Sequence, residues 1–176
     1  PLTVEGNFTA DGGTIKLDGN YPVGTDNVAL GDAAGSSLTT GIRNTLVGSL
    51  AGDSFTDADF NVAVGYGALN ADTLGSGSVA VGDFTLVNQN NTSATTTYNT
   101  AVGYASGSSV TTGVNNTLIG GLAGDAITTG GSNVALGASA LTSNTTASNN
   151  TAVGYQAAYS NTTGIANVGL GAYALQ

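Results

Sequence analysis

The hydrophobic and polar positions of the chain follow a five-residue phrase, Asn-[Val/Thr]-[Ala/Leu]-[Val/Leu/Ile]-Gly. The closing glycines are 17 residues apart, except between Gly82 and Gly103, where the step is 21. A fixed period with one insertion is typical of a solenoid. Nine copies or close variants occur, at Asn27–Gly31, Asn44–Gly48, Asn61–Gly65, Ser78–Gly82, Asn99–Gly103, Asn116–Gly120, Asn133–Gly137, Asn150–Gly154 and Asn167–Gly171.

Each phrase predicts a short β-strand, so the fold class is all-β. The first and third residues of the strand point to one face and the middle residue to the other. Both faces are apolar, as in a parallel sheet that is covered on both sides. We therefore expect the face with the larger residues to fill the coil, and the face with the small residues to admit another copy of the chain. The middle residues are Ala29, Leu46, Ala63, Ala80, Ala101, Leu118, Ala135, Ala152 and Gly169.

Two positions in the second half of each coil compensate for one another, four and seven residues after the closing glycine. In one coil type the first is glycine and the second is apolar: Gly35 with Leu38, Gly52 with Phe55, Gly107 with Val110 and Gly124 with Ile127. In the other type a larger residue precedes a polar one: Leu69 with Asp72, Leu86 with Gln89, Leu141 with Asn144 and Ala158 with Asn161. We infer one internal slot that either position fills, since empty or overfilled space costs about 1 kcal/mol or more.

Polar residues also recur from coil to coil. Threonines such as Thr39, Thr56 and Thr73 align at one turn, and glycine follows several Thr-Thr pairs, where it permits a tight turn. The strand-initial asparagines are expected to stack into an amide ladder. The members of that ladder are Asn27, Asn44, Asn61, Asn99, Asn116, Asn133, Asn150 and Asn167.

The pattern predicts two parts. Residues 1–26 lack the phrase and are expected to form a β-hairpin, cap or linker. Residues 27–176 form the nine-coil solenoid, with a polar inserted loop at 88–98 between two related blocks. Shifting residues 27–56 by 72 onto 99–128 gives 19 identities in 30 positions. Gln176 closely follows the last phrase, so the final coil is expected to be incomplete and the chain to be a fragment.

Charge and composition exclude some classes of binding partner. The 176 residues include eleven acidic ones against only Lys16 and Arg43, for a net charge of −9. Two basic residues cannot line a nucleic-acid groove, and anionic membrane surfaces are disfavoured. No apolar run is long enough to span a bilayer, and no signal peptide is visible. We expect no nucleic acid partner and no membrane insertion.

Catalytic chemistry is not expected. The chain has no histidine and no cysteine, which leaves no triad, no thiol nucleophile and almost no route to a zinc site. Phosphate-binding loops and calcium-repeat motifs are missing as well. Paired carboxylates could act on a glycan, but we interpret them as solvated turn residues. Those carboxylates are Asp53, Asp57, Asp59 and Asp72. We predict no catalytic residue, no metal and no cofactor.

Two groups of residues are candidate surface contacts. Tyr66, Tyr104 and Tyr155 each follow a closing glycine, where an aromatic ring could stack on a sugar or could simply cover the adjoining strand. The inserted loop presents Asn90, Asn91 and Thr92, and loops on rigid scaffolds often bind partners. A structural spacer between the two blocks explains this loop equally well.

The phrases Asn27–Gly31 and Asn61–Gly65 resemble the head repeats of YadA-type trimeric autotransporter adhesins, repeats that also occur in bacteriophage tail fibres. The resemblance covers Asn27 to Gln176. It implies a left-handed parallel β-roll, three chains around one axis, and attachment rather than catalysis. The 17-residue coil is longer than the typical adhesin repeat, and the neck, stalk and anchor are missing.

The glycine-rich opening, Gly6–Gly24, looks more like phage structural proteins, so we favour a tail fibre over a bacterial adhesin head. Few large apolar residues per coil also favour self-association, because ordering the chain is costly. The expected partners are two further copies, neighbouring fibre or virion proteins, and a host-surface glycan or protein, in an extracellular location. Ice binding through the threonine ladder is a third and weaker alternative.

Overall fold

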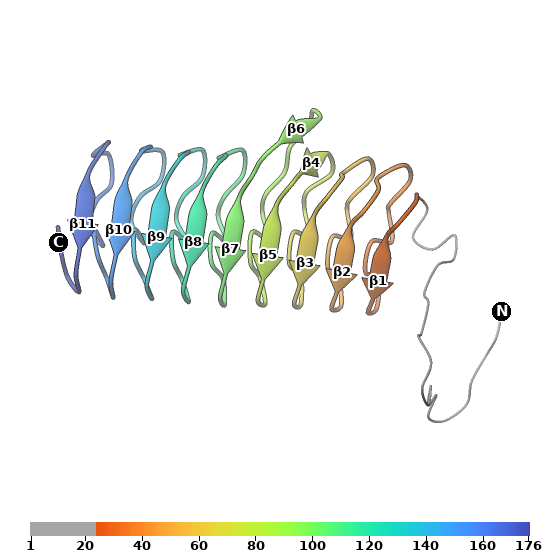
Figure 1. The fold of residues 1–176 in the computed structure, drawn as a ribbon, viewed down its shortest axis with the longest axis horizontal. Helices are drawn as coiled ribbons and strands as arrows, with labels where there is room; N and C mark the ends of the chain where they lie inside the picture. The colour runs from red at the N-terminus through yellow and green to blue at the C-terminus, as the bar shows by residue number, and fades with distance from the viewer. Residues whose placement is uncertain (1–23) are drawn as a thin grey trace, which may run out of the picture.

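The structure is a computed structural model, and it describes residues 24–176 as a stack of coils (Figure 1). The hairpin predicted for residues 1–26 falls almost entirely outside the described residues. No helix occurs in residues 24–176, and the all-β prediction is confirmed. The main sheet consists of β1 (Val28–Leu30), β2 (Thr45–Val47), β3 (Val62–Val64), β5 (Val79–Val81), β7 (Thr100–Val102), β8 (Thr117–Ile119), β9 (Val134–Leu136), β10 (Thr151–Val153) and β11 (Val168–Leu170).

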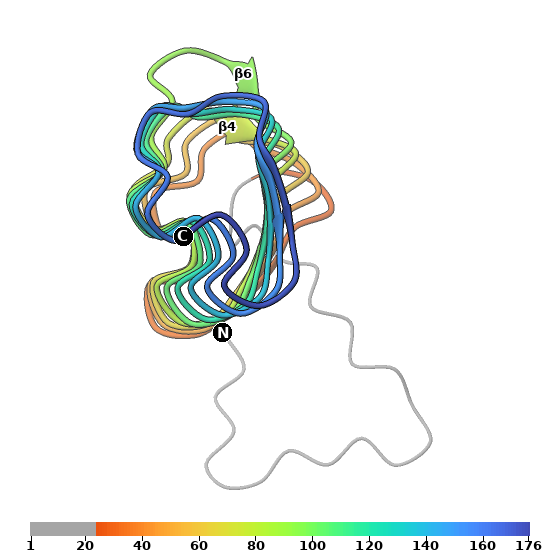
Figure 2. The same cartoon turned by 90° about the vertical axis from the view of Figure 1, so that its left-hand side faces the viewer.

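All nine strands of this sheet are parallel, and each pairs with the strand of the next coil. Val28 lies opposite Thr45 and Thr45 opposite Val62, so the register advances by one 17-residue repeat at every step. The longer step is absorbed without a shift, because Val79 lies opposite Thr100. The β-solenoid of 17-residue coils is therefore confirmed, with nine strands and about eight turns. Viewed end-on, the coils follow nearly the same outline (Figure 2).

The inserted segment forms a small overhang on one side of the stack. Strand β4 (Gly75–Ser76) pairs in parallel with β6 (Thr95–Thr96) in a separate two-stranded sheet. Both strands lie beyond the main sheet, and β6 projects furthest (Figures 1 and 2). Gln89 and Thr97 are fully buried, whereas Thr92, Ser93 and Ala94 are exposed. The ends of the insertion therefore belong to the coil, and only its centre protrudes.

The assignment of the two strand faces was wrong. The small middle residues point into the coil, where Ala63, Ala80 and Ala101 have no exposed surface. The first and third residues point outward, and Leu30 and Leu136 are about 45% and 44% exposed. The small-residue face is the inner wall of the coil, so it cannot be the surface that meets another chain.

The shared internal slot is confirmed. Phe55, Val110 and Ile127 have no exposed surface, and the same is true of Leu69 and Leu86 from the other coil type. A Cβ placed on Gly52 would lie 2.9 Å from the ring of Phe55, and one on Gly124 would lie 2.8 Å from Ile127. Contacts that short do not occur, so a large residue at one position requires glycine at the other.

The closing glycines from Gly31 to Gly154 form a column that admits no side chain. Gly120 has a φ of +133°, and a Cβ there would lie 2.6 Å from the carbonyl group of Gly137 in the next coil. The same close approach joins Gly31 to Gly48 and Gly48 to Gly65. Both the left-handed backbone and the lack of space explain why glycine recurs here.

The strand-initial asparagines are hydrogen-bonded from coil to coil, and all but Asn167 are buried. The backbone N–H of Asn44 donates to Oδ1 of Asn27 at 2.8 Å, and Nδ2 of Asn44 donates to the carbonyl of Ala58 at 2.7 Å. The backbone bond recurs along the chain as far as Asn167. These side chains satisfy backbone groups that the corner of each coil would otherwise bury unpaired.

Candidate functional site

The asparagine column is interrupted where the two blocks meet, and a buried polar network replaces it. Ser78 stands in place of asparagine, and its Oγ lies 2.5 Å from Oγ1 of Thr97. Gln89 donates from Nε2 to Asp72 and to Ser78, and its Oε1 accepts from Asn99 at 2.9 Å. All five residues are fully buried. This network anchors both ends of the insertion to the coil and so positions the overhang.

A groove of about 470 Å³ lies beneath the overhang. It is lined by residues of the neighbouring coil, of the junction coil and of the insertion, brought together from distant parts of the sequence. The lining residues are Asp57, Asp59, Phe60, Ser76, Gly77, Ala94, Thr95, Thr96 and Tyr98. Phe60 and Tyr98 are 50% and 65% exposed, so the fold leaves both rings open to a ligand.

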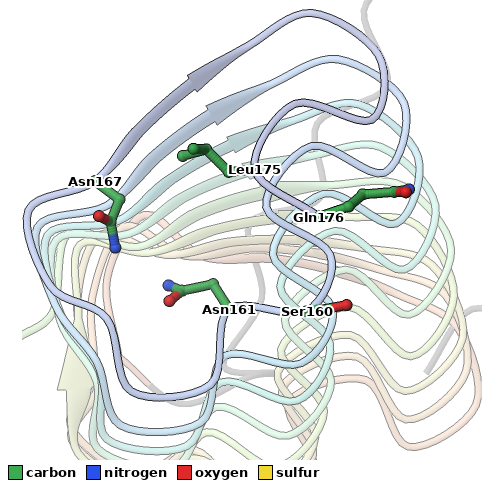
Figure 3. Close-up of a pocket in the computed structure, with 5 residues that line it drawn as sticks. All are labelled: Ser160, Asn161, Asn167, Leu175 and Gln176. Carbon is green, nitrogen blue, oxygen red and sulfur yellow. The ribbon is translucent and has the colours of Figure 1, made fainter.

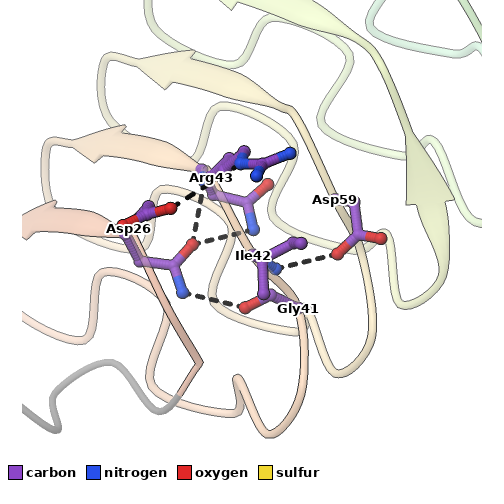
Figure 4. A network of polar contacts seen from close by, with 7 residues as sticks. Asp26, Gly41, Ile42, Arg43 and Asp59 are labelled. Atoms are coloured by element: carbon purple, nitrogen blue, oxygen red, sulfur yellow. Dashed lines mark hydrogen bonds and ion pairs between the residues drawn. The ribbon is translucent and has the colours of Figure 1, made fainter.

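The groove lies along a row of unlike residues, one from each coil, at the position before the strand-initial polar residue. Nε of Arg43 lies 3.6 Å from Oδ2 of Asp26, and its guanidinium carbon lies 5.6 Å from the centroid of the Phe60 ring. Gly77 and Tyr98 continue the row. Figure 4 shows Arg43 beside Asp26, with the adjoining turn bonded to Asp59.

Two of the four carboxylates that the sequence offered as a possible catalytic pair line this groove. Asp57 accepts a hydrogen bond from Oγ1 of Thr40 at 2.5 Å, and Asp59 accepts from the backbone N–H of Ile42 at 2.8 Å. Each uses Oδ1, and no described residue donates to the second oxygen of either carboxylate. Both groups can therefore accept a hydrogen bond from a ligand.

The other two carboxylates have structural positions. Asp53 accepts a hydrogen bond from the hydroxyl of Ser36 and does not line the groove. Asp72 is fully buried and accepts from Gly75, Asn91 and Gln89. The structure therefore separates the four acids into a pair that faces a groove and two that hold the coil.

The predicted tyrosines lie on the opposite edge of the main sheet, after the strands. Tyr66 and Tyr104 are both exposed and are bridged by Phe84, with ring centroids 5.3 and 6.2 Å apart in edge-to-face contacts. Tyr155 contacts Tyr173 in the same way at 5.4 Å. Phe84 was not among the predicted contacts, because it lies two residues after its glycine rather than one; its hydrophobicity at a turn was the available signal.

The candidate loop residues are divided by the fold. Asn90 and Thr92 are exposed, but Asn91 is only 5% exposed, so its prediction as a surface contact was wrong. The backbone N–H of Asn91 donates to Oδ1 of Asp72, which draws this residue into the coil. The residues that border the groove are instead Ala94, Thr95 and Thr96, a few positions further along.

Comparison with known proteins gives no match to this chain, neither among protein-family models nor among curated proteins or solved structures.

The outer face of the main sheet is a second candidate surface. Its two columns contain only aliphatic residues and threonine, and all of these side chains are partly or largely exposed. The first column comprises Val28, Thr45, Val62, Val79, Thr100, Thr117, Val134, Thr151 and Val168. The second comprises Leu30, Val47, Val64, Val81, Val102, Ile119, Leu136, Val153 and Leu170. The face continues along every strand of the sheet.

A smaller hollow of about 280 Å³ lies at the last coil. Figure 3 shows the side chains of Asn161, Asn167 and Leu175 pointing into the space that the coil surrounds, with Ser160 and Gln176 at its rim. Asn161 is already bonded to the backbone of Gly164 through both its amide atoms. The hollow is thus the interior of the coil viewed from its end.

We also searched residues 24–176 for metal-ligating groups, membrane-spanning helices and carboxyl groups with a shifted pKa. No group of three or more metal-ligating side chains is found among them, and none of their segments is a helix long and apolar enough to cross a membrane. Burial raises the pKa of Asp125 above its ordinary value, against opposing hydrogen bonds from its own backbone and Thr142. Oδ1 of Asp125 is buried without a partner in the described structure.

Proposed function

We propose that this chain is a non-enzymatic structural segment of a homotrimeric fibre that supports attachment to a host surface, with a bacteriophage tail fibre as the favoured context. The observation that carries the proposal is the outer face of the main sheet. Monomeric proteins rarely expose a continuous apolar patch of more than a few hundred Å². At about 4.8 Å per strand, nine strands give this face a height of roughly 38 Å.

Several properties of the chain suit such a role. Its outer face is free of charge over nine strands, so packing against copies of itself would bury no unpaired ion. The coils are joined by a backbone ladder through all nine strands and by asparagine hydrogen bonds on both sides of the junction, which stiffen a shaft along its axis. The copy number of three and the tail-fibre context come from the resemblance of the repeats to trimeric adhesin heads and phage fibres.

Light scattering on the purified chain, from micromolar to nanomolar concentration, tests self-association. The expected mass is three times the 17.0 kDa of the chain. A folded monomer at every concentration would contradict the proposal, and a stable dimer would contradict the trimer.

Matched variants assign the interface. Replacing Val64, Val81 and Val102 by lysine adds three charges to the outer face and should give a folded monomer, because buried unpaired charges are costly. Replacing Thr112, Thr129 and Thr146 by lysine adds the same charge at exposed turn positions and should leave the mass unchanged. Equal effects of both triple variants would point away from the sheet face.

A further inference from the structure

The row of residues that precede the strands lacks a side chain at the junction coil, where the residue is Gly77. In coil order it runs Asp26, Arg43, Phe60, Gly77 and Tyr98. The cation of Arg43 lies between a carboxylate and a ring. At Gly77 there is no side chain, although Phe60 and Tyr98 lie on either side of it.

The space above Gly77 is bounded by two rings. With strands about 4.8 Å apart, the backbones of Phe60 and Tyr98 are separated by roughly 10 Å, and only a glycine lies between them. A Cβ on Gly77 would meet Thr96 and Tyr98 at 3.4 Å, an ordinary contact distance, so the floor of the groove is closely formed. The overhang closes one side. The groove can thus hold a small group against the two rings.

The charge of this groove is negative. Asp57 and Asp59 both line it, and each has an oxygen to which no described residue donates. Arg43 is the one basic side chain in residues 24–176, and it is already paired with Asp26 and Phe60. Two carboxylates beside the exposed ring of Tyr98 and the part of the Phe60 ring that Arg43 leaves uncovered favour a cation, through charge-assisted hydrogen bonds and cation–π attraction.

We propose that this groove binds an organic ammonium group, such as the charged end of a lysine side chain or of an amino sugar. The ammonium lies above Gly77, contacts the rings of Phe60 and Tyr98, and donates hydrogen bonds to Asp57 and Asp59. It repeats, two coils further along, the arrangement in which Arg43 lies over Phe60 beside Asp26. The site is formed within one chain and does not depend on the proposed self-association.

NMR titration of the full chain tests the proposal, with the backbone amide signals of Gly77, Thr95 and Tyr98 as reporters. One arm uses the Nα-acetylated methylamide of lysine against its Nε-acetylated form, and the other uses glucosamine against N-acetylglucosamine. We expect each amine to bind about tenfold more tightly than its neutral counterpart. The stronger amine distinguishes a peptide from a saccharide source. Equal binding of charged and neutral forms, or no shift of these signals, would overturn the site.

Variants separate the site from a general attraction of cations to an acidic protein. Asp59→Asn keeps an oxygen for the N–H of Ile42 and should weaken amine binding about tenfold, as should Tyr98→Leu. Gly77→Lys places a cation of the chain itself in the groove, at a residue whose φ of +78° also strains any side chain, and should abolish binding. The controls Asp53→Asn and Tyr104→Leu remove the same groups outside the groove and should bind as the parent does. Weakening by the controls, or unchanged binding in all three groove variants, would refute the assignment.

Discussion

The regular coils after Asn99 and the junction coil around Asp72–Tyr98 use the same strand register but satisfy their interiors differently. In the regular coils the strand-initial asparagines bond to one another one repeat apart, as Asn116 and Asn133 do. In the junction coil the partners are particular side chains, such as Gln89 with Asp72. Repetition fixes a fold with few residue types, and the break in repetition is where unlike groups are brought together.

The strongest test of the regular region is Gly120→Ala. The new Cβ would lie 2.6 Å from the next coil at a φ of +133°, so both the contact and the backbone are strained. We expect a loss of about 3 kcal/mol or more in the free energy of unfolding. Urea denaturation followed by circular dichroism measures it.

Its neighbour provides the control. A Cβ on Gly121 meets nothing within 4 Å, so the free energy of unfolding of Gly121→Ala should lie within about 0.5 kcal/mol of that of the parent. Similar losses for the two variants would show that the glycine column is not what holds adjacent coils at their spacing.

The second test compares equivalent positions of the two blocks, 72 residues apart. Asp72→Ala removes the acceptor of three donors, from Gly75, Gln89 and Asn91, whereas Asn144→Ala affects only the N–H and carbonyl of Ala147. We expect losses of about 3 and about 2 kcal/mol, since each stranded buried group costs about 1–3 kcal/mol.

Thermal and urea unfolding of both variants measure this difference. The Asp72→Ala protein should additionally show altered amide signals in the overhang, because Asn91 loses its bond to Asp72. If Asn144→Ala is the more damaging of the two, the junction network does not anchor the insertion.

The smallest effect is expected at Asp125, the last charged residue of the chain. Its pKa is raised by burial, so the folded state favours the protonated form. The protonated side chain therefore adds to the free energy of unfolding. This stabilisation is complete below the ordinary pKa of about 3.8 and is lost as the pH rises through the higher pKa of the folded state. Asp125→Asn should therefore stabilise the protein at pH 7, by less than about 1 kcal/mol because the side chain is only partly buried.

Unfolding curves at pH 7 and pH 3 check the sign. The advantage of Asp125→Asn should disappear at pH 3, where both states of the parent are protonated. Ser109→Ala, at an uncharged position in the preceding coil, should show no such dependence on pH. If Asp125→Asn is still more stable than the parent by the same amount at pH 3, the stabilisation comes from packing and not from the charge.

Much of the fold could be predicted from the sequence because every coil repeats the same constraints. The glycine spacing gave the coil length, and the inverse pairing of Gly52 with Phe55 gave the internal slot. The face of the strand was mistaken because alternation shows which residues share a face, not which face is inside. Phe55 and Leu86 fill the coil from its other half, leaving room only for small residues such as Ala63.

The candidate groove could not be predicted in the same way. It brings residues 57–60 beside residues 94–98, and that contact depends on how the insertion folds back over the coil. The repeat pattern carries no information about this contact, because the insertion occurs only once in the chain. Aromatic residues before a strand, at Phe60 and Tyr98 alone, were the one local signal, and they are found at the very position where other coils carry small or polar residues.

The strict glycine and asparagine columns have a consequence for how the gene can change. An in-frame gain or loss of one whole coil brings identical corner residues back into alignment, whereas any other length displaces every later column. Recombination between the two related blocks removes or adds 72 residues and also preserves the order of the two coil types. Length can therefore vary in whole repeats while the interior stays continuous, so the reach of the protein can evolve separately from its surface chemistry.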